Sequence, residues 1–154
     1  MKLNEEISIF WFRRDLRLND NAGLYHALKE SKQVLPVFIF DITILEQLEN
    51  KEDRRVEFIL LALKEMHNQL EELGSSLLIL HDTPLQAFEK LLSDYTIQAV
   101  YTNHDYEPYA TKRDKSIQEL LKKKSIELKT FKDQVIFEKN EVAKDDGLTY
   151  TIFT

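Results

Sequence analysis

The runs ISIFWF at residues 7–12 and VLPVFIF at residues 34–40 decide the fold of this chain. Each run is short, almost wholly apolar and rich in β-branched or aromatic residues, which is the pattern of a strand buried on both faces of a parallel sheet. Between the two runs, Asp20 or Asn21 can cap a helix that continues to about residue 29. The order strand, loop, helix, strand predicts a parallel βαβ unit.

The same alternation continues along the chain. A long helix is predicted over residues 54–73, with Gly74 as its left-handed C-terminal cap. The helix after it has strong start signals, namely an N-cap, a first-turn proline and a capping-box partner at Thr83, Pro84 and Gln86. We expect the side of the long helix that packs on the sheet to consist of Val56, Leu60, Leu63, His67 and Leu70.

Three further strands and one further helix complete the pattern. The strands are expected at residues 77–80, 99–101 and 126–131, and the helix from Pro108 to about residue 123. Strict alternation of strand and helix implies right-handed crossovers and a parallel sheet that is covered on both sides. The sequence therefore predicts a doubly wound, Rossmann-like α/β fold, with a five-stranded parallel sheet and helices on both faces.

Glycine, cysteine and histidine usage excludes several classes of site. The three glycines stand at positions 23, 74 and 147, too far apart for a GxGxxG fingerprint or a P-loop. The chain has no cysteine, which rules out disulfides, thiolate zinc sites and a cysteine nucleophile. The four histidines are also too widely spaced for a helical HExxH pair, so no metal site is expected.

Charge and hydropathy limit the classes of partner that the chain is expected to bind. The 21 Lys and Arg against 27 Asp and Glu give a net charge of −6, which argues against a non-specific nucleic-acid binder. The amino terminus is polar, and no apolar run is long enough for a signal-peptide core or a membrane span. We therefore expect a cytoplasmic protein with no membrane partner.

Charged side chains follow the first predicted strand. In open parallel sheets, ligands bind beyond the carboxyl ends of the strands, near the switch in strand order. A cluster of arginines at that place can hold an anion, an aromatic ligand or a partner domain. The alternative is an ion-pair network within the domain, with Asp15, Asp20 or Asp41 as partners. The cluster consists of Arg13, Arg14, Asp15 and Arg17.

A second polar group follows the fourth predicted strand and consists of Asn103, His104, Asp105 and Glu107, with tyrosines around it. Carboxylates beside aromatic faces suit a flat heteroaromatic ligand whose ring N–H groups need acceptors. The alternative is a plain helix start, where acidic groups are favoured by the helix dipole. Neither a Ser, His, Asp arrangement nor a matched pair of carboxylates stands out, so we assign no catalytic residue.

Four segments carry a resemblance to a known family: WFRRDLRLNDN at 11–21, PVFIFD at 36–41, YTNHDYEPYATKRD at 101–114 and GLTYTIFT at 147–154. Together they resemble the amino-terminal domain of the DNA photolyase and cryptochrome family. The resemblance implies a light-harvesting α/β domain over residues 1–131. It also implies that residues 132–154 lead toward a larger helical domain that is absent here, so that the chain is a fragment.

In this family the helical domain holds flavin adenine dinucleotide (FAD) and binds damaged DNA. The resemblance thus implies the antenna part of a deoxyribodipyrimidine photolyase, a carbon–carbon lyase of DNA repair, and a fragment that is not catalytic alone. The antenna chromophore passes its excitation to the FAD, so the task of this domain is positional. The chromophore stays open between methenyltetrahydrofolate, 8-hydroxydeazaflavin and a second flavin.

The resemblance also implies roles for single residues. Glu107 matches the acidic residue that folate-binding members place against the pterin ring. A deeper site of deazaflavin-binding members is matched by Asp105, Arg55, Trp11, Phe40 and Asp41. The arginine cluster after the first strand matches the family signature, and we expect it to fix the rim of the cleft and the interface with the helical domain.

Three rival functions remain, and one of them is that the fragment acts only as an interaction module. A cryptochrome photoreceptor contains the same amino-terminal domain, and its distinguishing residues are expected in the helical domain and tail. A generic nucleotide-binding α/β module is a more distant alternative. The glycine spacing counts against that module, because no glycine-rich phosphate loop is present.

Overall fold

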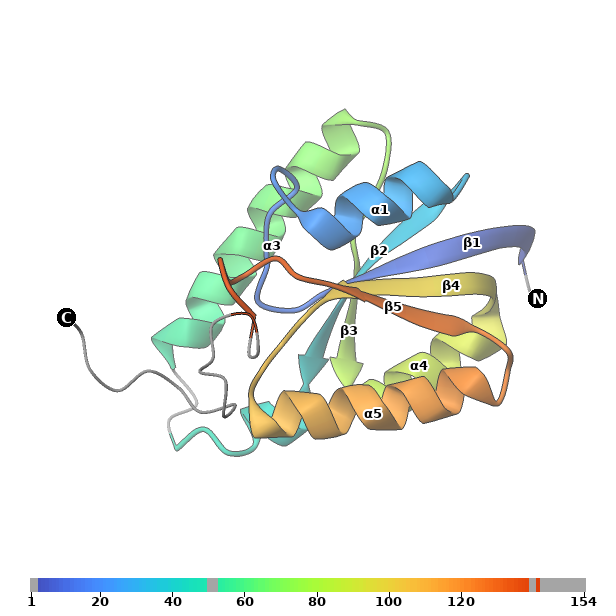
Figure 1. Ribbon diagram of the computed structural model, residues 1–154. Coiled ribbons are helices and arrows are strands. Elements are labelled where there is room, and N and C mark those ends of the chain that lie inside the picture. The colour runs from blue at the N-terminus through green and yellow to red at the C-terminus, as the bar shows by residue number, and fades with distance from the viewer. Residues whose placement is uncertain (1–2, 50–52, 139–140, 142–154) are drawn as a thin grey trace.

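The computed structural model describes residues 3–49, 53–138 and 141. In these residues five parallel strands form one sheet in the order β3-β2-β1-β4-β5 (Figure 1). The chain fills one half of the sheet from β1 outward and then crosses to β4, so the switch in strand order lies between β1 and β4. The predicted doubly wound fold is confirmed. The strands are β1 (Leu3–Phe12), β2 (Val34–Asp41), β3 (Leu78–Asp82), β4 (Tyr95–Asn103) and β5 (Glu127–Phe131).

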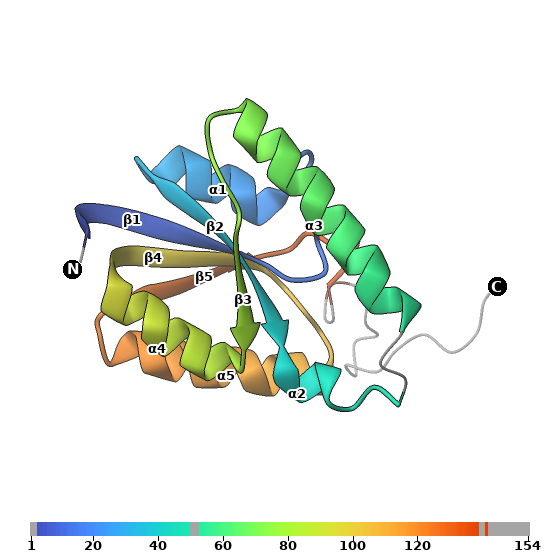
Figure 2. The same ribbon diagram turned by 180° about the vertical axis from the view of Figure 1, so that it is seen from behind.

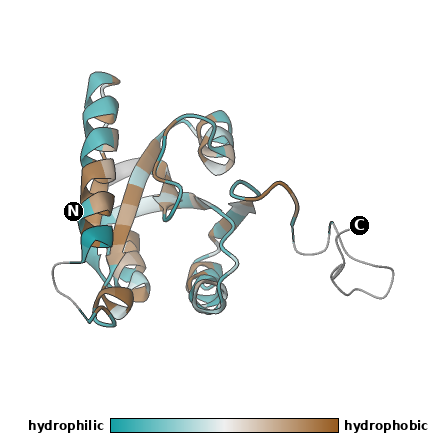
Figure 3. Cartoon of the chain, turned by 90° about the vertical axis from the view of Figure 1, so that its left-hand side faces the viewer, coloured by the Kyte–Doolittle hydropathy of each residue, from teal (hydrophilic) through white to brown (hydrophobic). Residues whose placement is uncertain are grey.

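Two pairs of helices cover the sheet. The helices α1 (Ala22–Glu30) and α3 (Arg54–Glu72) lie on one face, and α4 (Pro84–Asp94) and α5 (Pro108–Lys122) lie on the other (Figures 1 and 2). Figure 3 shows apolar residues concentrated on the strands between these layers, whereas the helices carry both apolar and polar residues.

Strand β1 divides its side chains between two cores. Successive side chains of a strand point to opposite faces of the sheet. Ile9 and Trp11 accordingly pack with α4 and α5, whereas Phe10 and Phe12 pack with α1 and α3. The ring centroids of Trp11 and Phe88 lie 5.0 Å apart in an edge contact, so Phe88 of α4 supports the Trp11 ring.

The predicted caps form. Asn21 Oδ1 accepts a hydrogen bond from the backbone N–H of Leu24 at 3.1 Å and begins α1. Thr83 Oγ1 accepts from the backbone N–H of Gln86 at 3.3 Å and begins α4. Gly74 has a φ of +76°, the left-handed conformation expected after α3.

The predicted sheet-facing side of α3 is partly wrong. Leu63 and Leu70 are buried as expected, but Leu60 is 51% exposed, and the third buried side chain is Met66. The covered stripe is rotated around the helix relative to the expected one, and it packs in the same core as Phe10, Phe12 and Phe38 of the central strands. Exposed apolar side chains therefore remain on the outer side of α3.

Two features of the fold escaped prediction. Strands β1 and β4 begin at Leu3 and Tyr95, each four residues before the expected start. The prediction missed these starts because polar residues, at 4–6 in β1 and at 96 and 98 in β4, interrupt the apolar pattern. A short helix, α2 (Ile42–Leu45), follows β2 directly. Its N-cap is Asp41, whose Oδ1 accepts from the backbone N–H of Thr43 at 3.0 Å. Four residues are too few to show a helical period.

After β5 the described residues 132–138 form neither helix nor strand. Asp133 holds this segment against the start of α1, because its carboxylate accepts from the backbone N–H of Ala22 at 2.9 Å. The sequence also predicts a turn at residues 144–147 and an extended segment at residues 149–154, and both lie outside the described residues. Within the described part of the chain, no helix combines the length and the apolar character needed to cross a membrane.

Candidate functional site

The loops after β1 and β4 meet at the carboxyl edge of the sheet. Asn103, at the end of β4, is 2% exposed. Its Nδ2 donates to Asp15 Oδ2 at 2.6 Å and to Asn21 Oδ1 at 2.8 Å, and its Oδ1 accepts from the backbone N–H of Gly23 at 2.8 Å. All polar groups of the Asn103 side chain are thus used to join the two loops. The convergence expected from the strand order is confirmed.

Arg13 strengthens the same junction from inside. Its Nη1 donates to both carboxylate oxygens of Asp114 at 2.6 Å, and its Nη2 donates to the backbone carbonyl of Asn103. The guanidinium also lies 5.1 Å from the centroid of the Trp11 ring. Burial lowers the pKa of Arg13, and the charge of Asp114 opposes that shift. The contacts of Arg13 fix the fold of the rim.

The partners expected for the other arginines were wrong. Arg14 Nη1 lies 2.5 Å from Glu107 Oε1, and Arg17 Nη2 lies 2.8 Å from Asp133 Oδ2. Asp20 contributes only its backbone carbonyl to Arg17, at 2.7 Å. The ion-pair network within the domain therefore exists, but its acids come from distant parts of the chain and not from Asp15, Asp20 or Asp41.

A cavity of about 270 Å³, here called the aromatic pocket, opens at this edge. Its volume is near the lower end of the range of small-molecule sites, about 300–1,000 Å³. The wall combines the ends of β1 and β2 with α2 and the first turns of α5. The residues that define it are Trp11, Phe40, Ile44, Leu45 and Tyr109, with Asp41, Asp105, Glu107 and Arg113 as polar groups.

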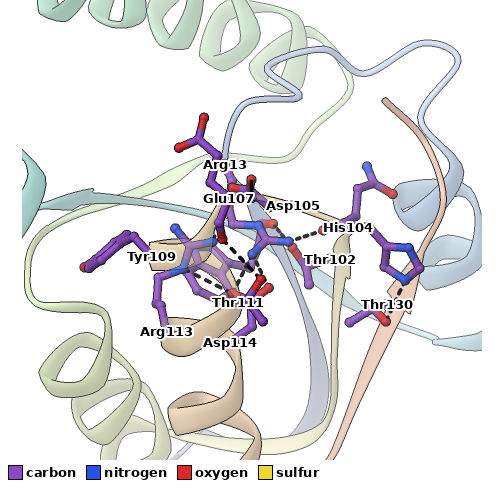
Figure 4. A network of polar contacts seen from close by, with 12 residues as sticks. Arg13, Thr102, His104, Asp105, Glu107, Tyr109, Thr111, Arg113, Asp114 and Thr130 are labelled. Atoms are coloured by element: carbon purple, nitrogen blue, oxygen red, sulfur yellow. Dashed lines mark hydrogen bonds and ion pairs between the residues drawn. The ribbon is translucent and has the colours of Figure 1, made fainter. Parts of the chain in front are cut away.

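Arg113 has an incomplete set of hydrogen bonds in this pocket. Its Nε donates to Asp114 at 3.1 Å, and its guanidinium lies 5.0 Å from the Trp11 ring centroid (Figure 4). Its Nη2 is buried and lies 3.5 Å from Asp105 Oδ2, but has no hydrogen-bond partner among the described residues. A buried donor without an acceptor costs about 1–3 kcal/mol. An acceptor on a ligand in the pocket would remove that cost.

Asp41 and Tyr109 form a hydrogen-bonded pair that also lines the pocket. The Tyr109 hydroxyl donates to Asp41 Oδ2 at 2.6 Å, while Asp41 Oδ1 caps α2. Burial, followed by the hydrogen bond to Asp41, raises the pKa of Tyr109. Tyr109 therefore stays a neutral phenol whose ring face forms part of the wall.

His104 and Tyr106 serve another part of the molecule. The His104 ring bonds Glu138 and, at 2.9 Å, Thr130 Oγ1, on the side away from Arg113 (Figure 4). The Tyr106 hydroxyl donates to Glu138 at 2.9 Å. Burial and then this hydrogen bond raise the pKa of Tyr106 to about 12. Both side chains hold the segment after β5 and do not line the aromatic pocket.

The structure brings together most of the residues predicted to bind a cofactor. Trp11, Phe40, Asp41, Asp105 and Glu107 all line the aromatic pocket. Arg55 does not line it: its side chain is 77% exposed and pairs with Asp53 at 2.6 Å. No group of three or more potential metal ligands lies together in the described residues. The role of the five pocket residues in binding a cofactor stays a prediction.

Arg113 was missed by the sequence analysis. A signal was available, because Tyr109 and Arg113 stand four residues apart on α5 and therefore share one face of the helix. Composition alone did not reveal which face of α5 meets the pocket. The guanidinium of Arg113 lies 5.9 Å from the Tyr109 ring centroid, as that spacing allows.

A model of a known protein family matches this chain. The model of the DNA photolyase family matches residues 8–154, which is nearly the whole chain. The chain belongs to the DNA photolyase family. The resemblance seen in the sequence is thereby confirmed, and this photolyase-family domain has the fold expected for it.

Relatives of the domain include photolyases and cryptochromes. The deoxyribodipyrimidine photo-lyase of Synechococcus sp. is 32% identical over 94% of this chain, and Cryptochrome-2 of Gallus gallus is 27% identical over 95%. The crystal structure of the Sulfolobus tokodaii photolyase, which contains two FAD molecules, is 34% identical over 88% of this chain with a TM-score of 0.80. The chain spans 30% of the Synechococcus protein and 31% of the Sulfolobus chain.

Proposed function

We propose that this photolyase-family domain holds an antenna chromophore in the aromatic pocket and passes its excitation to FAD in a helical domain of a longer protein. That protein would use the energy to repair pyrimidine dimers in DNA. One observation carries the proposal: the buried Nη2 of Arg113 forms no hydrogen bond with the described residues, although Asp105 Oδ2 lies 3.5 Å away, and it lies in a pocket walled by aromatic rings. A planar dye with a ring oxygen satisfies both features.

Different residues of the pocket would contact different parts of such a dye. Arg113 donates to a ring oxygen of the dye. Asp105 Oδ2, which lies 3.5 Å from Arg113 Nη2, fixes the guanidinium and offers an acceptor to a ring N–H. Phe40 and Tyr109 supply apolar faces, and Trp11 closes the inner wall. When bound, the chromophore itself supplies the light absorption, so the protein provides distance and orientation.

A flavin is the chromophore that we favour among the three candidates. The crystal structure of the Sulfolobus tokodaii photolyase contains two FAD molecules, which imply a novel light-harvesting cofactor in that protein. Its 34% identity to this chain makes a shared chromophore class reasonable. Methenyltetrahydrofolate and 8-hydroxydeazaflavin are the alternatives. In the same proposal, residues 1–131 form the antenna domain, residues 132–154 lead to the helical domain, and the protein works in the cytoplasm.

The test is equilibrium binding to the 154-residue chain. FAD, 8-hydroxydeazaflavin and methenyltetrahydrofolate are titrated separately, with ATP as competitor, and absorption and fluorescence report the bound dye. We expect saturable binding of at least one dye, with FAD bound most tightly, and a strong loss for Arg113→Gln. Lys115→Gln, which removes the same charge from an exposed position on α5, is the matched control. Binding of ATP alone, or dye binding that ignores Arg113→Gln, contradicts the proposal.

Photolyase activity is favoured over a cryptochrome function by similarity. The Synechococcus photo-lyase is 32% identical to this chain, compared with 27% for the chicken cryptochrome. The decisive assay uses the protein encoded by the complete gene and measures light-dependent loss of cyclobutane dimers from an oligonucleotide. A protein that binds the dye but leaves the dimers intact would favour the cryptochrome reading.

A further inference from the structure

Two neighbouring apolar side chains are exposed on the segment that follows β5. We call residues 132–138 the exit segment, because the chain leaves the sheet through it. Ile136 is 83% exposed and Phe137 is 63% exposed. Figure 3 shows the hydrophobic part of this segment standing clear of the sheet and the helices. Single exposed apolar side chains are common, whereas two adjacent ones form a small apolar patch, here called the apolar pair.

The first end of the exit segment is held by Asp133. Its carboxylate accepts from the backbone N–H of Ala22 at 2.9 Å and lies 2.8 Å from Arg17 Nη2. The Asp133 side chain is only 3% exposed. Ala22 is the first residue of α1, so the positive end of the helix dipole also attracts the carboxylate. Buried, charge-assisted hydrogen bonds thus fix this end to the domain.

The second end of the exit segment is held by Glu138. The Tyr106 hydroxyl donates to Glu138 Oε1 at 2.9 Å, and His104 Nδ1 bonds the same oxygen. The backbone N–H of Glu138 donates to Glu141 Oε2 at 2.8 Å, and Lys132 Nζ donates to that oxygen at 2.6 Å. The two ends of the segment are therefore joined to the domain and to each other.

The apolar pair lies between these two fixed ends. Gln134 Nε2 adds a further bond to the domain, because it donates to the backbone carbonyl of His104 at 2.9 Å. The exposure of Ile136 and Phe137 is thus a property of a held segment and not of a loose chain end. A segment that is already ordered loses little conformational freedom when a partner covers it.

The rest of a longer protein is the partner that these observations favour. The chain spans 30% of the Synechococcus photo-lyase, so a protein of that length contains a large further part. A domain attached through the exit segment stays close to the apolar pair and meets it at a high effective concentration. Contacts between domains of one chain resemble protein–protein interfaces, in which a few apolar anchors carry much of the binding energy.

We propose that Ile136 and Phe137 dock into an apolar hollow of the helical domain, and that Asp133 and Glu138 fix the position from which they do so. The inference rests on the proposed antenna function and names the contact that keeps the dye and the FAD at a set distance. Of the arginine cluster expected at this interface, Arg17 acts as a positioning residue, because it pairs with Asp133.

An introduced thiol tests whether the apolar pair is covered. The chain has no cysteine, so Phe137→Cys provides a single reporter in it. The variant is made in the 154-residue chain and in the protein encoded by the complete gene, and maleimide labelling at this position is followed by peptide mass spectrometry. Labelling should be roughly tenfold slower or more in the complete protein, because a covered thiol reacts only after local opening.

Glu89→Cys is the control for this experiment. It places a thiol at an exposed position of α4, on the other face of the sheet from α1, where the exit segment is held. Its labelling rate should be the same in the two proteins.

A double variant tests what the contact contributes. Ile136→Ser with Phe137→Ser should leave the melting temperature and the dye affinity of the 154-residue chain unchanged, because both side chains are exposed there. In the complete protein it should lower the melting temperature and the efficiency of energy transfer from the dye to the FAD. Leu28→Ser, which removes an exposed apolar side chain of α1, is the matched control and should change neither quantity.

The contrary results separate this inference from the antenna function. Equal labelling of Phe137→Cys in the two proteins overturns the docking contact and leaves the aromatic pocket as the dye site. If labelling of the 154-residue chain slows as its concentration rises, the apolar pair meets a second copy and the inference is wrong. If the pair is protected in the complete protein but none of the three dyes binds, the antenna function fails and the contact between domains stands.

Discussion

The Asn103 side chain accepts a hydrogen bond from the backbone N–H of Gly23 at 2.8 Å, which joins the end of β4 to the first turn of α1. A Cβ at position 23 would lie 2.7 Å from Asn103 Oδ1 and 2.9 Å from a ring carbon of Phe10. Both neighbours are buried and cannot withdraw freely. The close approach explains why a glycine stands in a helix.

Gly23→Ala should therefore lower the free energy of unfolding by about 1–3 kcal/mol, the usual cost of overpacking. The better helix propensity of alanine, about 1 kcal/mol, is expected to offset only part of this. Urea unfolding measures the change. Gly74→Asn is the control, because position 74 has a φ of +76° with nothing within 4 Å, and asparagine tolerates that conformation. Equal stability of Gly23→Ala and the unmodified chain would contradict the packing argument.

Asn103→Ala should be among the most destabilising polar substitutions in the chain. It leaves Asp15, Asn21 and Gly23 each short of a buried hydrogen bond, with an expected loss of at least about 2 kcal/mol. Thr102→Val is a neighbouring comparison that removes a single bond, from Oγ1 to the Trp11 carbonyl at 2.9 Å. Chemical denaturation should show a clearly smaller loss for Thr102→Val. Similar losses for the two variants would mean that the loops are not joined mainly through Asn103.

Asp53 should make the stability of α3 depend on pH in the acid range. Hydrogen bonds from the Arg55 side chain and then its backbone lower the pKa of Asp53 from 3.8 to about 2. A carboxyl group whose pKa is lower in the folded than in the unfolded state stabilises the protein at a pH above its unfolded-state pKa. This stabilisation is lost as the pH falls through the folded-state pKa. The advantage of the unmodified chain over Asp53→Asn should thus be constant near neutral pH and vanish between about pH 4 and about pH 2.

Urea midpoints measured across that range provide the check. Asp94→Asn, an exposed position for which the described residues offer no ion pair or hydrogen bond, serves as the control and should show no such trend. A difference between the unmodified chain and Asp53→Asn that persists unchanged at about pH 2 would mean that Asp53 is not held by Arg55.

Asp105 and Glu107, two of the carboxylates of the aromatic pocket, should differ in how much they contribute to dye binding. Asp105 has 8% of its side chain exposed and lies beside Arg113, whereas Glu107 is 65% exposed and pairs with Arg14. Asp105→Asn should weaken dye binding roughly tenfold and Glu107→Gln by less than about threefold, since water screens the exposed group. Fluorescence titration with FAD measures both, with Glu119→Gln as an exposed control on α5.

If the domain belongs to a photolyase as proposed, repair driven by direct excitation of that photolyase's FAD should survive both substitutions, because only the antenna is affected. Equal loss of repair at wavelengths that FAD itself absorbs would refute the assignment. A larger effect for Glu107→Gln than for Asp105→Asn would move the binding site outward, toward the exposed rim.

Local patterns were sufficient to predict the fold. The apolar runs around Trp11 and Phe38 identified two central strands, and the caps at Asn21 and Thr83 fixed two helix starts, because these signals act within a few residues. The predicted strand order then indicated that the loops after β1 and β4 meet, which the hydrogen bonds of Asn103 confirm. The rotation of α3, with Met66 and not Leu60 buried, depends on the neighbour that the helix meets and has no local signal.

The site could be predicted only in part for a related reason. The acids that pair with Arg13 and Arg17, Asp114 and Asp133, are 101 and 116 residues away. No spacing rule connects such positions before the sheet brings them together. Arg113 was overlooked because a charged residue on a helix is usually exposed.

Trp11 is the only tryptophan of the chain, and it is 2% exposed at the inner wall of the aromatic pocket, with Arg13 and Arg113 near its ring. Its indole emission overlaps the absorption of flavins, so a flavin bound as proposed would quench it by energy transfer. The chain thus contains its own spectroscopic reporter: quenching of its single tryptophan would follow loading of the cavity, and a change in tryptophan emission colour would follow denaturation.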